Sequence, residues 1–170
     1  MIFLLLSFLY ETIFYPIIYI FPAYAANGAP ILFGGWGPID KKKKLFGKRI
    51  FGDNKTIRGA ISGILAGLIV GLILYPFFNY MPIIGLMMGI GTIVGDLFGS
   101  FIKRRLGFKP GMQFPIMDQF GFVIFALIFA FSLGHMPNIY GIAFIIILTG
   151  IMHPATNIIA NKMSLKDVPW

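Results

Sequence analysis

Cysteine is absent from this chain, and charged residues are scarce. None of the 170 residues is a cysteine, which excludes disulfide bridges, thiolate metal sites and thiol nucleophiles. Two histidines leave little for a histidine-ligated zinc ion. Charged residues make up 12% of the chain, whereas a soluble domain carries ~25%. The sequence therefore predicts a membrane protein, and its length suits a single domain over residues 1–170.

Hydrophobic residues make up 58% of the chain and gather in five apolar stretches. Each stretch is close to the ~20 residues that cross the hydrocarbon core as a helix. The predicted spans are Ile2–Ala26, Arg58–Asn79, Pro82–Ile102, Gln119–Met136 and Asn138–Ala160. We therefore expect an all-α integral membrane fold of five transmembrane helices, with a bend in the first helix near Pro16 and Pro22.

All 14 lysines and arginines fall on one side of this five-span topology. Eight lie between the first span and the start of the second, four lie between the third and fourth spans, and two follow the last span. Cytoplasmic loops of membrane proteins carry an excess of cations. We therefore expect the N-terminus outside, the C-terminus in the cytoplasm, and the two long loops forming a polar cavity at the cytoplasmic face.

Glycines recur at every fourth residue in two of the predicted spans. The second span contains Gly59, Gly63, Gly67 and Gly71, and the third contains Gly91, Gly95 and Gly99. Residues four apart lie on one helix face, and small residues there let helices approach closely in lipid. We expect these two helices to pack together, although a homodimer through the same faces would leave the same pattern.

One carboxylate lies inside a predicted span. Asp96 precedes Ile102 by six residues, which places it about 9 Å inside the cytoplasmic end of its helix. An ionisable group in a span costs at least about 2.5–3.5 kcal/mol on insertion scales, so it usually faces a cavity, a partner or an ion. Ser100 and Lys103 share its helix face. A functional carboxylate is therefore favoured over a structural ion pair, for which Lys103 is one candidate partner.

A second carboxylate, Asp118, stands directly before the fourth span, where an aspartate on its own suits a helix N-cap. Asp96 and Asp118 flank a loop that contains the cations Lys103, Arg104, Arg105 and Lys109. Mg²⁺ is held in proteins by one or two carboxylates together with substrate phosphates, and phosphates are bound by lysine and arginine. Carboxylates and cations at one membrane face therefore suit a metal–phosphate substrate.

The first long loop ends in the run Gly52-Asp53-Asn54-Lys55-Thr56, immediately before the second span. A helix N-terminus offers unpaired N–H groups and the positive end of the helix dipole. Lys55 and Arg58 add full charges beside it, so we predict that they bind a substrate phosphate. The run Lys41–Lys44 instead suits attraction to anionic lipid.

Other polar residues give weaker indications. Asn27 and Pro30 lie where the first span reaches the cytoplasm, which suits a helix terminator or a polar substrate contact. Asn157 and Asn161 lie near the cytoplasmic end of the last span and suit the lining of a cavity. Glu11 lies about 20 Å from the cytoplasmic end, too deep for a phosphate site there, and is interpreted as a structural partner or a neutral acid. The two histidines are interpreted as interface or packing residues.

Several motifs of this chain resemble a known family. The resemblance to phosphatidate cytidylyltransferases rests on Ser100-Phe101-Ile102-Lys103-Arg104, Lys109 and Pro115-Ile116-Met117-Asp118-Gln119. The narrower resemblance to the CDP-archaeol synthases of archaea rests on Asn27-Gly28-Ala29-Pro30, Pro38-Ile39-Asp40, the run from Arg49 to Gly59, and Gly95-Asp96. It covers nearly the whole chain. The broader signature usually has a second aspartate shortly after the position of Asp118, where this chain has Gly121.

The resemblance implies a reaction and a set of site residues. CTP and an unsaturated archaeal ether-lipid phosphate, digeranylgeranylglyceryl phosphate, would give CDP-archaeol and pyrophosphate, with Mg²⁺ as cofactor. It implies that Asp96 and Asp118 bind the metal. The implied phosphate contacts are Lys55, Arg58, Lys103, Arg104 and Lys109. The residues expected to be catalytic are Asp96, Asp118, Lys103 and Arg104. Further candidates for substrate binding are Asn27, Asp53, Thr56 and Ser100.

Three other functions are weighed against this one. A membrane carrier that used Asp96 and Glu11 as an ion relay would need polar groups across both halves of the bilayer, whereas here they crowd at one face. A CDP-alcohol phosphotransferase would need a denser aspartate motif. A polyprenol or lipid kinase shares much of the chemistry and stays open as an alternative. No nucleic acid is expected as a partner.

Overall fold

The computed structural model describes residues 1–109 and 112–169. Its helices are α1 (Ile2–Leu9), the π-helix η1 (Tyr10–Phe14), α2 (Tyr15–Phe33), α3 (Ile57–Leu74), α4 (Met81–Arg105), α5 (Pro115–Phe131) and α6 (Ile139–Lys162). By length and composition, four helical segments within the described ranges can cross a membrane: Ile2–Phe33, Ile57–Leu74, Met81–Arg105 and Ile139–Lys162. The fifth, α5, is apolar and has 17 residues, at the lower limit of a span of ~17–25 residues.

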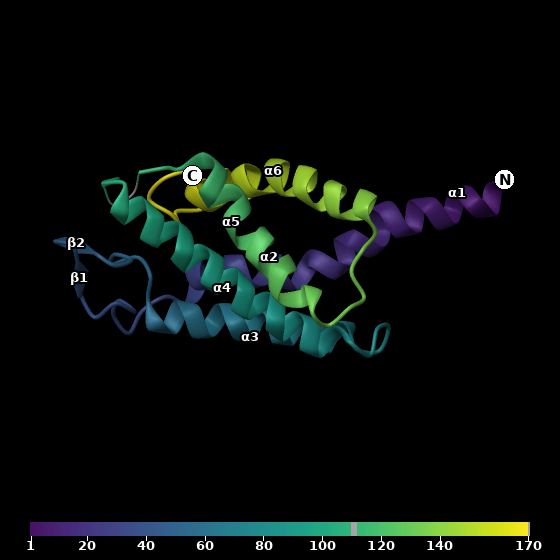
Figure 1. Cartoon of the computed structure of the whole chain (residues 1–170), viewed down its shortest axis with the longest axis horizontal. Coiled ribbons are helices and arrows are strands. Elements are labelled where there is room, and N and C mark those ends of the chain that lie inside the picture. The colour runs from purple at the N-terminus through teal and green to yellow at the C-terminus, as the bar shows by residue number, and fades with distance from the viewer. Residues whose placement is uncertain (110–111, 170) are drawn as a thin grey trace.

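The helices form an elongated bundle whose two ends differ in character. α3 and α4 run side by side along one flank, α6 lies on the other, and α1 projects beyond the bundle (Figure 1). The C-terminus lies at the same end as the β-hairpin, and the N-terminus lies at the opposite end (Figure 1). We call the first of these the hairpin end. The segments that carry the lysines and arginines all meet there, because the short α3–α4 and α5–α6 connections turn at the other end.

A small antiparallel hairpin interrupts the otherwise helical fold. Its strands are β1 (Lys44–Leu45) and β2 (Lys48–Arg49), and the two residues between them have positive φ angles of 50° at Phe46 and 75° at Gly47. Positive φ at both central positions is the requirement of a type I′ turn. The all-α prediction is confirmed apart from this hairpin, which sequence analysis did not predict.

The first helix extends further than predicted. α2 continues through Asn27 and Pro30 to Phe33, so neither residue terminates it, and that interpretation is wrong. A proline inside a helix removes one backbone hydrogen bond, which neighbouring helices in a membrane bundle can compensate. Upstream, the π-helix η1 directly precedes α2, whose second residue is Pro16. The helix type therefore changes beside Pro16, and the predicted bend near Pro16 and Pro22 stays a prediction.

Two helix ends at the hairpin end also differ from the predicted spans. α4 continues to Arg105, so Lys103 and Arg104 lie in its last turn rather than in a loop. Cations are favoured there by the negative end of the helix dipole. α5 begins at Pro115, which places Asp118 inside the helix rather than before it. Both shifts bring charged side chains onto rigid helical turns instead of loops.

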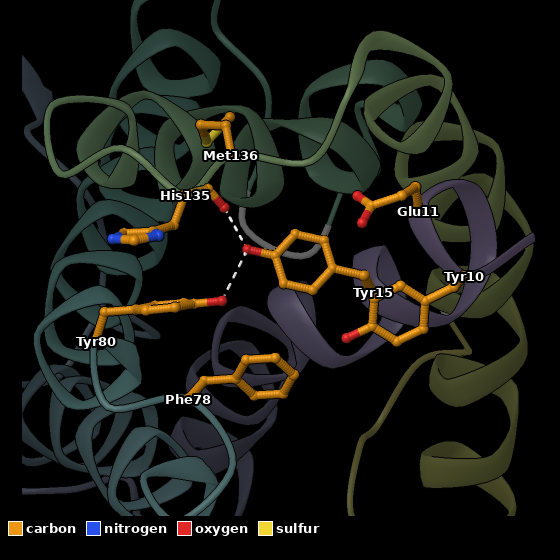
Figure 2. A pocket seen from close by; sticks show the side chains of 7 residues that line it. All are labelled: Tyr10, Glu11, Tyr15, Phe78, Tyr80, His135 and Met136. Carbon is orange, nitrogen blue, oxygen red and sulfur yellow. Dashed lines mark hydrogen bonds between the residues drawn. The ribbon is translucent and has the colours of Figure 1, made fainter. Parts of the chain in front are cut away.

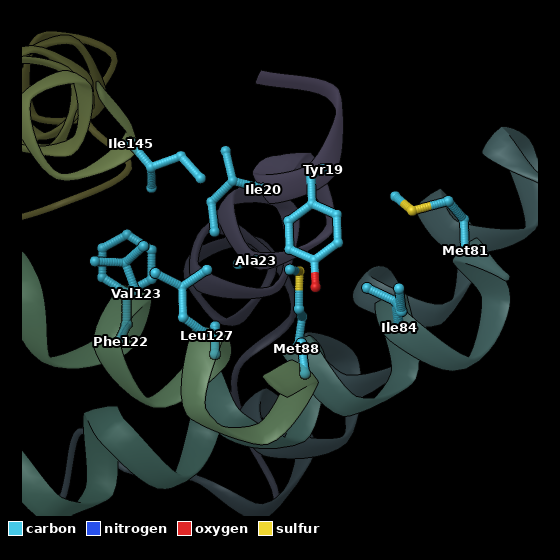
Figure 3. Close-up of a cluster of buried hydrophobic side chains, with 12 residues drawn as sticks. Tyr19, Ile20, Ala23, Met81, Ile84, Met88, Phe122, Val123, Leu127 and Ile145 are labelled. Atoms are coloured by element: carbon cyan, nitrogen blue, oxygen red, sulfur yellow. The ribbon is translucent and has the colours of Figure 1, made fainter. Parts of the chain in front are cut away.

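The hydrophobic core lies where α2, α4 and α5 meet, with α6 closing one side (Figure 3). The side chains drawn and labelled there are Tyr19, Ile20, Ala23, Met81, Ile84, Met88, Phe122, Val123, Leu127 and Ile145. Many large apolar side chains on the outer faces are exposed, and α1 buries none of its residues. Exposed apolar surface of this extent suits helices that face lipid.

Glycines bring α3 and α4 into backbone contact. A Cβ added at Gly67 would lie 2.5 Å from the carbonyl oxygen of Gly85 and 2.9 Å from the Cα of Gly89. The predicted packing of α3 against α4 is therefore confirmed. The α4 stripe that meets α3, however, is Gly85 and Gly89 rather than the predicted one.

The other glycine stripe of α4 faces α5. A Cβ at Gly91 would lie 2.5 Å from the carbonyl oxygen of Phe125, and one at Gly95 would lie 2.6 Å from that of Gly121. Six residues separate Gly85 from Gly91, which is about 240° around a helix of 3.6 residues per turn. α4 therefore uses two faces for two partners, and the expectation that its second stripe meets α3 is wrong.

Candidate functional site

A cavity of about 650 Å³ opens at the hairpin end of the bundle, within the range of ~300–1,000 Å³ usual for ligand sites. α2, α3, α4, α5 and α6 all contribute to its lining, together with the first long loop and the residues after α6. The predicted site residues in its lining are Asn27, Asp53, Lys55, Thr56, Asp96, Ser100, Lys103, Arg104 and Asp118. Segments that are distant in sequence therefore converge on one polar space.

Two of the predicted phosphate contacts lie outside this lining. Arg58 is exposed, and its guanidinium lies over the ring of Trp36, 5.9 Å from the ring centroid. Lys109 is also exposed, and its carbonyl oxygen accepts a hydrogen bond from Arg104 at 3.4 Å. Arg58 and Lys109 therefore lie outside the cavity that the other predicted phosphate contacts line.

Two aspartate–lysine ion pairs lie in the cavity. Lys55 Nζ donates to Asp96 Oδ2 at 2.5 Å, and Lys103 Nζ donates to Asp118 Oδ1 at 2.7 Å. Asp96 is therefore in an ion pair, as the structural alternative held, but its partner is Lys55 rather than Lys103 of its own helix. The Asp96 side chain is 39% exposed and that of Asp118 is 26% exposed, so both carboxylates remain accessible from the cavity.

Asp118 has a second role in the first turn of α5. The N-cap of this helix is Phe114, whose backbone N–H donates to Asp118 Oδ2 at 2.9 Å. The interpretation of Asp118 as the N-cap itself is wrong, but its side chain reaches back from four residues further along and accepts from the N-cap N–H. One carboxylate oxygen thus binds the backbone and the other binds Lys103, which holds the group in a defined orientation.

Arg104 presents an unsatisfied donor at the same site. Its Nε is buried and has no hydrogen-bond partner among the residues that the structure describes. Buried side-chain donors are almost always paired in folded proteins. Arg104 also lines the cavity, so its guanidinium is a candidate for binding phosphate.

The first long loop is organised around Asp40, a residue that sequence analysis did not place in the site. Its side chain is fully buried and accepts hydrogen bonds from the Arg49 guanidinium at 2.7 and 3.2 Å. It also accepts from the backbone N–H groups of Lys42, Phe51 and Gly52 at 3.0–3.1 Å. Burial opposes the charged form, but these hydrogen bonds outweigh it and hold the pKa of Asp40 well below its ordinary value.

The same network reaches the cavity lining. Arg49 also binds Asp53 at 2.7 Å, and Asp53 lines the cavity two residues before Lys55. The pKa of Arg49 is raised by its hydrogen bonds to Asp40 and Asp53, so it remains charged. Asp40 is therefore a positioning residue for the loop that delivers Lys55. The sequence singled out Asp40 only within the family motif Pro38-Ile39-Asp40, and its burial and partners appear only in the fold.

Asp40→Asn is expected to lower the free energy of unfolding by about 1–3 kcal/mol, because an amide offers one acceptor where five donors converge. The wild-type carboxylate has a lowered pKa, so its stabilisation is fully present above the ordinary carboxyl pKa of about 3.9 and is lost as the pH falls below that value. The fluorescence of the two tryptophans can report thermal unfolding in detergent at pH 7 and at lower pH. Equal midpoints for both proteins at pH 7 would contradict this role, and Asp167→Asn, at an exposed position, is the control.

Arg105 attaches the hairpin to the end of α4. Its guanidinium donates to the carbonyl oxygens of Leu45 and Arg49 at 2.5 Å and of Lys48 at 3.2 Å. Lys48 Nζ donates in return to the Arg105 carbonyl oxygen at 3.1 Å. Arg105 therefore acts on the loop rather than in the cavity. The predicted lipid-surface run Lys41–Lys44 is exposed and lies outside the cavity lining.

Thr56 caps the helix that begins beside the cavity. Its hydroxyl accepts hydrogen bonds from the backbone N–H groups of Gly59 and Gly35, both at 3.1 Å. The cap satisfies one N–H of the first turn of α3 and ties the end of α2 to it. Thr56 is thus a structural residue of the site lining, whatever contact it makes with a ligand.

α6 contributes side chains that the sequence indicated weakly. Asn157 is buried and lines the cavity, as predicted, and it lies 3.3 Å from His153 Nδ1. His153 also lines the cavity, so the packing interpretation is incomplete for this histidine. After the helix, Lys166 lines the cavity as well, although no sequence signal placed it there.

A second cavity, of about 260 Å³, lies at the opposite end of the bundle and is lined mainly by aromatic side chains (Figure 2). The Tyr15 hydroxyl donates to the carbonyl oxygen of His135 and lies 3.2 Å from the Tyr80 hydroxyl, while the His135 ring stacks on Tyr80. Glu11 lies at its edge, away from these hydrogen bonds (Figure 2). The prediction that Glu11 is remote from the polar site therefore agrees with the structure.

Four aspartates line the large cavity: Asp53, Asp96, Asp118 and Asp167. Among the described residues, no group of three or more histidine, cysteine, aspartate or glutamate side chains could hold a metal ion. Asp96 and Asp118 do line the same cavity. One or two carboxylates with substrate phosphates is the usual coordination of catalytic Mg²⁺, so these residues fit Mg²⁺ that arrives with a phosphorylated substrate.

Comparison with known proteins resolves the family. The family model described as CarS-like, CDP-archaeol synthase, matches residues 9–170. The CDP-archaeol synthase of Pyrococcus furiosus is 42% identical over 159 aligned residues, covering 89% of this chain and 95% of that protein. The chain belongs to the CDP-archaeol synthase family. The resemblance stated from the motifs is thereby confirmed.

Other members of the CDP-archaeol synthase family agree with this assignment. The CDP-archaeol synthase of Methanococcus aeolicus is 38% identical over 168 aligned residues, covering 90% of this chain and 94% of that protein. A solved structure described as an intramembrane enzyme for archaeal membrane lipid biosynthesis superposes with a TM-score of 0.78 at 34% identity, covering 84% of this chain and 92% of that one. Together with its apolar helices, this places the present CDP-archaeol synthase family member among multi-pass membrane proteins.

Proposed function

We propose that this protein transfers the CMP moiety of CTP to an unsaturated archaeal ether-lipid phosphate, digeranylgeranylglyceryl phosphate, giving CDP-archaeol and pyrophosphate with Mg²⁺. The observation that carries the proposal is the convergence of two aspartate–lysine pairs in one cavity. The names of its relatives, which share about 40% of its residues, support the same reaction. A cavity between membrane helices suits a reaction between a soluble nucleotide and a lipid.

The hairpin end is proposed to face the cytoplasm. All 14 lysines and arginines lie on segments that meet at this end, and such a bias sets the orientation of membrane proteins. The N-terminus would then lie outside. This orientation places the cavity where cytoplasmic CTP can enter it and where the lipid phosphate lies near the head-group layer.

The chemistry is an in-line displacement at phosphorus. An oxygen of the lipid phosphate attacks the α-phosphorus of CTP, the bond from that phosphorus to the oxygen bridging to the β-phosphate breaks, and pyrophosphate leaves with the bonding electrons. The attacking phosphate is already ionised near neutral pH, so no general base is needed. Mg²⁺ bound with the nucleotide at Asp96 and Asp118 would neutralise phosphate charge and orient the reacting groups.

The two lysines are proposed to change partners when the substrates bind. In the structure Lys55 and Lys103 are each paired with an aspartate beside the cavity. If Asp96 and Asp118 held the metal ion, the ammonium groups of Lys55 and Lys103 would be free to donate to phosphate oxygens. The guanidinium of Arg104, which lines the same cavity, is a third donor for the leaving pyrophosphate.

Lys103→Ala is expected to reduce turnover about tenfold or more, since a hydrogen bond to a charged group contributes about 1.5–3 kcal/mol. Lys42→Ala removes the same charge from an exposed position outside the cavity and is expected to change turnover less than twofold. Initial rates of CTP-dependent transfer by the purified proteins measure both. Equal effects of the two substitutions would show that the cavity lysine has no special role.

The proposed reaction can be separated from a lipid kinase by the position of the label in CTP. Label at the α-phosphate should enter the lipid fraction in the presence of Mg²⁺, whereas label at the γ-phosphate should be released as pyrophosphate. Transfer of the γ-label into lipid would instead identify a kinase. Parallel incubations with ATP, GTP and UTP test the selectivity for the cytosine base.

A further inference from the structure

The chain reverses direction at the end of α6 and returns to the cavity. Ser164 adopts a positive φ of 58°, its N–H donates to the carbonyl oxygen of Asn161 at 2.9 Å, and the N–H of Leu165 donates to that of Ala160 at 2.9 Å. This pair of hydrogen bonds around one left-handed residue is a Schellman motif. It directs the following residues back along the helix, so that residues 165–168 line the cavity. We call residues 164–168 the C-terminal tail.

Two asparagines of α6, one helical turn apart, hold this tail. Asn161 Nδ2 donates to the carbonyl oxygen of Lys166 at 2.9 Å, and Lys166 Nζ donates to Asn157 Oδ1 at 3.0 Å. Asn157 is 7% exposed, so the acceptor of the ammonium group is itself buried. The backbone and the side chain of Lys166 are therefore both anchored on the helix that borders the cavity.

The surroundings of Lys166 disfavour the charged form of its side chain. Burial lowers the pKa of this lysine, the positive charge of Lys55 lowers it further, and the carboxylates of Asp118 and Asp96 act in the opposite direction. These electrostatic partners are the members of the two ion pairs in the cavity. The ammonium group thus lies within the field of the proposed reaction site rather than at the outer surface. A multiply charged anion in the cavity would offset the cost.

We infer that Lys166 is a further phosphate-binding residue of this site, and that the C-terminal tail forms one wall of the substrate pocket. The identity of the ligand rests on the proposed function, which offers two sources of phosphate, CTP and the ether-lipid phosphate. A lysine that only packed against α6 could do so on the outer side of the helix, outside the cavity. Here the Schellman turn and both asparagines direct it inward.

The test compares four purified variants with the wild type. Lys166→Met removes the charge, Lys166→Gln keeps a donor for Asn157, and Lys166→Arg keeps the charge. Lys162→Met removes a charge from an exposed position in the last turn of α6 and is the matched control. Initial rates are measured with CTP varied at saturating lipid phosphate and with the lipid varied at saturating CTP, and thermal unfolding is followed in parallel.

Lys166→Met and Lys166→Gln are expected to raise one KM by about tenfold, with a smaller change in kcat, because a charge-assisted hydrogen bond is lost. Lys166→Arg should restore most of this affinity, and Lys162→Met should match the wild type. A rise in the KM for CTP assigns the contact to the nucleotide, and a rise in the KM for the lipid assigns it to the lipid phosphate. Unchanged KM values in Lys166→Gln, or a loss of kcat alone, would overturn the inference.

The failure of the inference can be told apart from the failure of the proposed function. A wild-type protein that does not transfer CMP would refute the proposed function without any variant. In that event the stabilisation of the protein against heat by added pyrophosphate still tests Lys166. Stabilisation of the wild type that is lost in Lys166→Gln would support phosphate binding, and equal behaviour of the two proteins would refute it.

Discussion

Asp96→Asn is expected to lower CTP-dependent nucleotidyl transfer by at least about 100-fold, in line with the loss of a principal electrostatic contact in other active sites. The amide keeps the shape of the side chain but loses the negative charge with which Asp96 is proposed to bind Mg²⁺. It also removes the ion pair with Lys55, which is 2.5 Å long in the structure. Incorporation of α-labelled CTP into lipid measures the effect.

The protein should remain folded, because the Asp96 side chain is 39% exposed and the surrounding helices pack through other residues. Size-exclusion chromatography and thermal unfolding in detergent would establish this. Glu11→Gln makes the same chemical change at the opposite end of the bundle and should leave turnover unaltered. Retained turnover in Asp96→Asn would remove the proposed metal-binding role and with it the mechanism.

Gly67→Ala is expected to destabilise the bundle by at least about 1–3 kcal/mol, the usual cost of overpacking a core. The added methyl group would lie 2.5 Å from the Gly85 carbonyl oxygen and 2.9 Å from the Gly89 Cα. Both neighbours are backbone atoms, so neither can move aside by changing a rotamer. α3 and α4 would have to separate, and the change should appear as a lower midpoint of thermal unfolding.

Gly28→Ala provides the matched control for this substitution. Gly28 also lies inside a helix, but no atom outside its own helix backbone lies within 4 Å of an added Cβ. Alanine has the higher helix propensity, so this variant should be as stable as the wild type or slightly more stable. If both alanine variants unfold at the same temperature, the backbone contact between α3 and α4 is not the source of the glycine requirement.

Sequence analysis predicted the helical segments better than their ends. Apolar runs of the right length predicted five spans, because the cost of exposing backbone and polar groups to lipid acts on each segment separately. The ends depended on neighbours. α2 continues past Asn27 and Pro30, and α4 retains its basic residues in the last turn. Packing against the hairpin loop and adjacent helices stabilises these turns, and the local sequence does not predict such packing.

The candidate site shows the same division. Asp96 could be recognised because a carboxylate inside an apolar helix is costly and is usually functional. The loop cations could be recognised because they are close together in the chain. The pairing of Asp96 with Lys55 and of Lys103 with Asp118 could not be read from spacing, since it depends on how α3, α4 and α5 are placed. Arg58 and Lys109 illustrate the reverse case, since sequence proximity grouped them with a cavity that they do not line.

Composition and the order of residues were sufficient to establish a membrane protein, the family and one face rich in cations, because each depends on the kind of residue and its neighbours in the chain. Which groups meet in the cavity was decided by the packing of the helices, the first long loop and the C-terminal tail. Asp40 and Lys166 contribute through hydrogen bonds to residues brought near by loops and a reversed turn. Such contacts depend on how the folded chain places these residues in space, so the order of residues along the chain does not predict them.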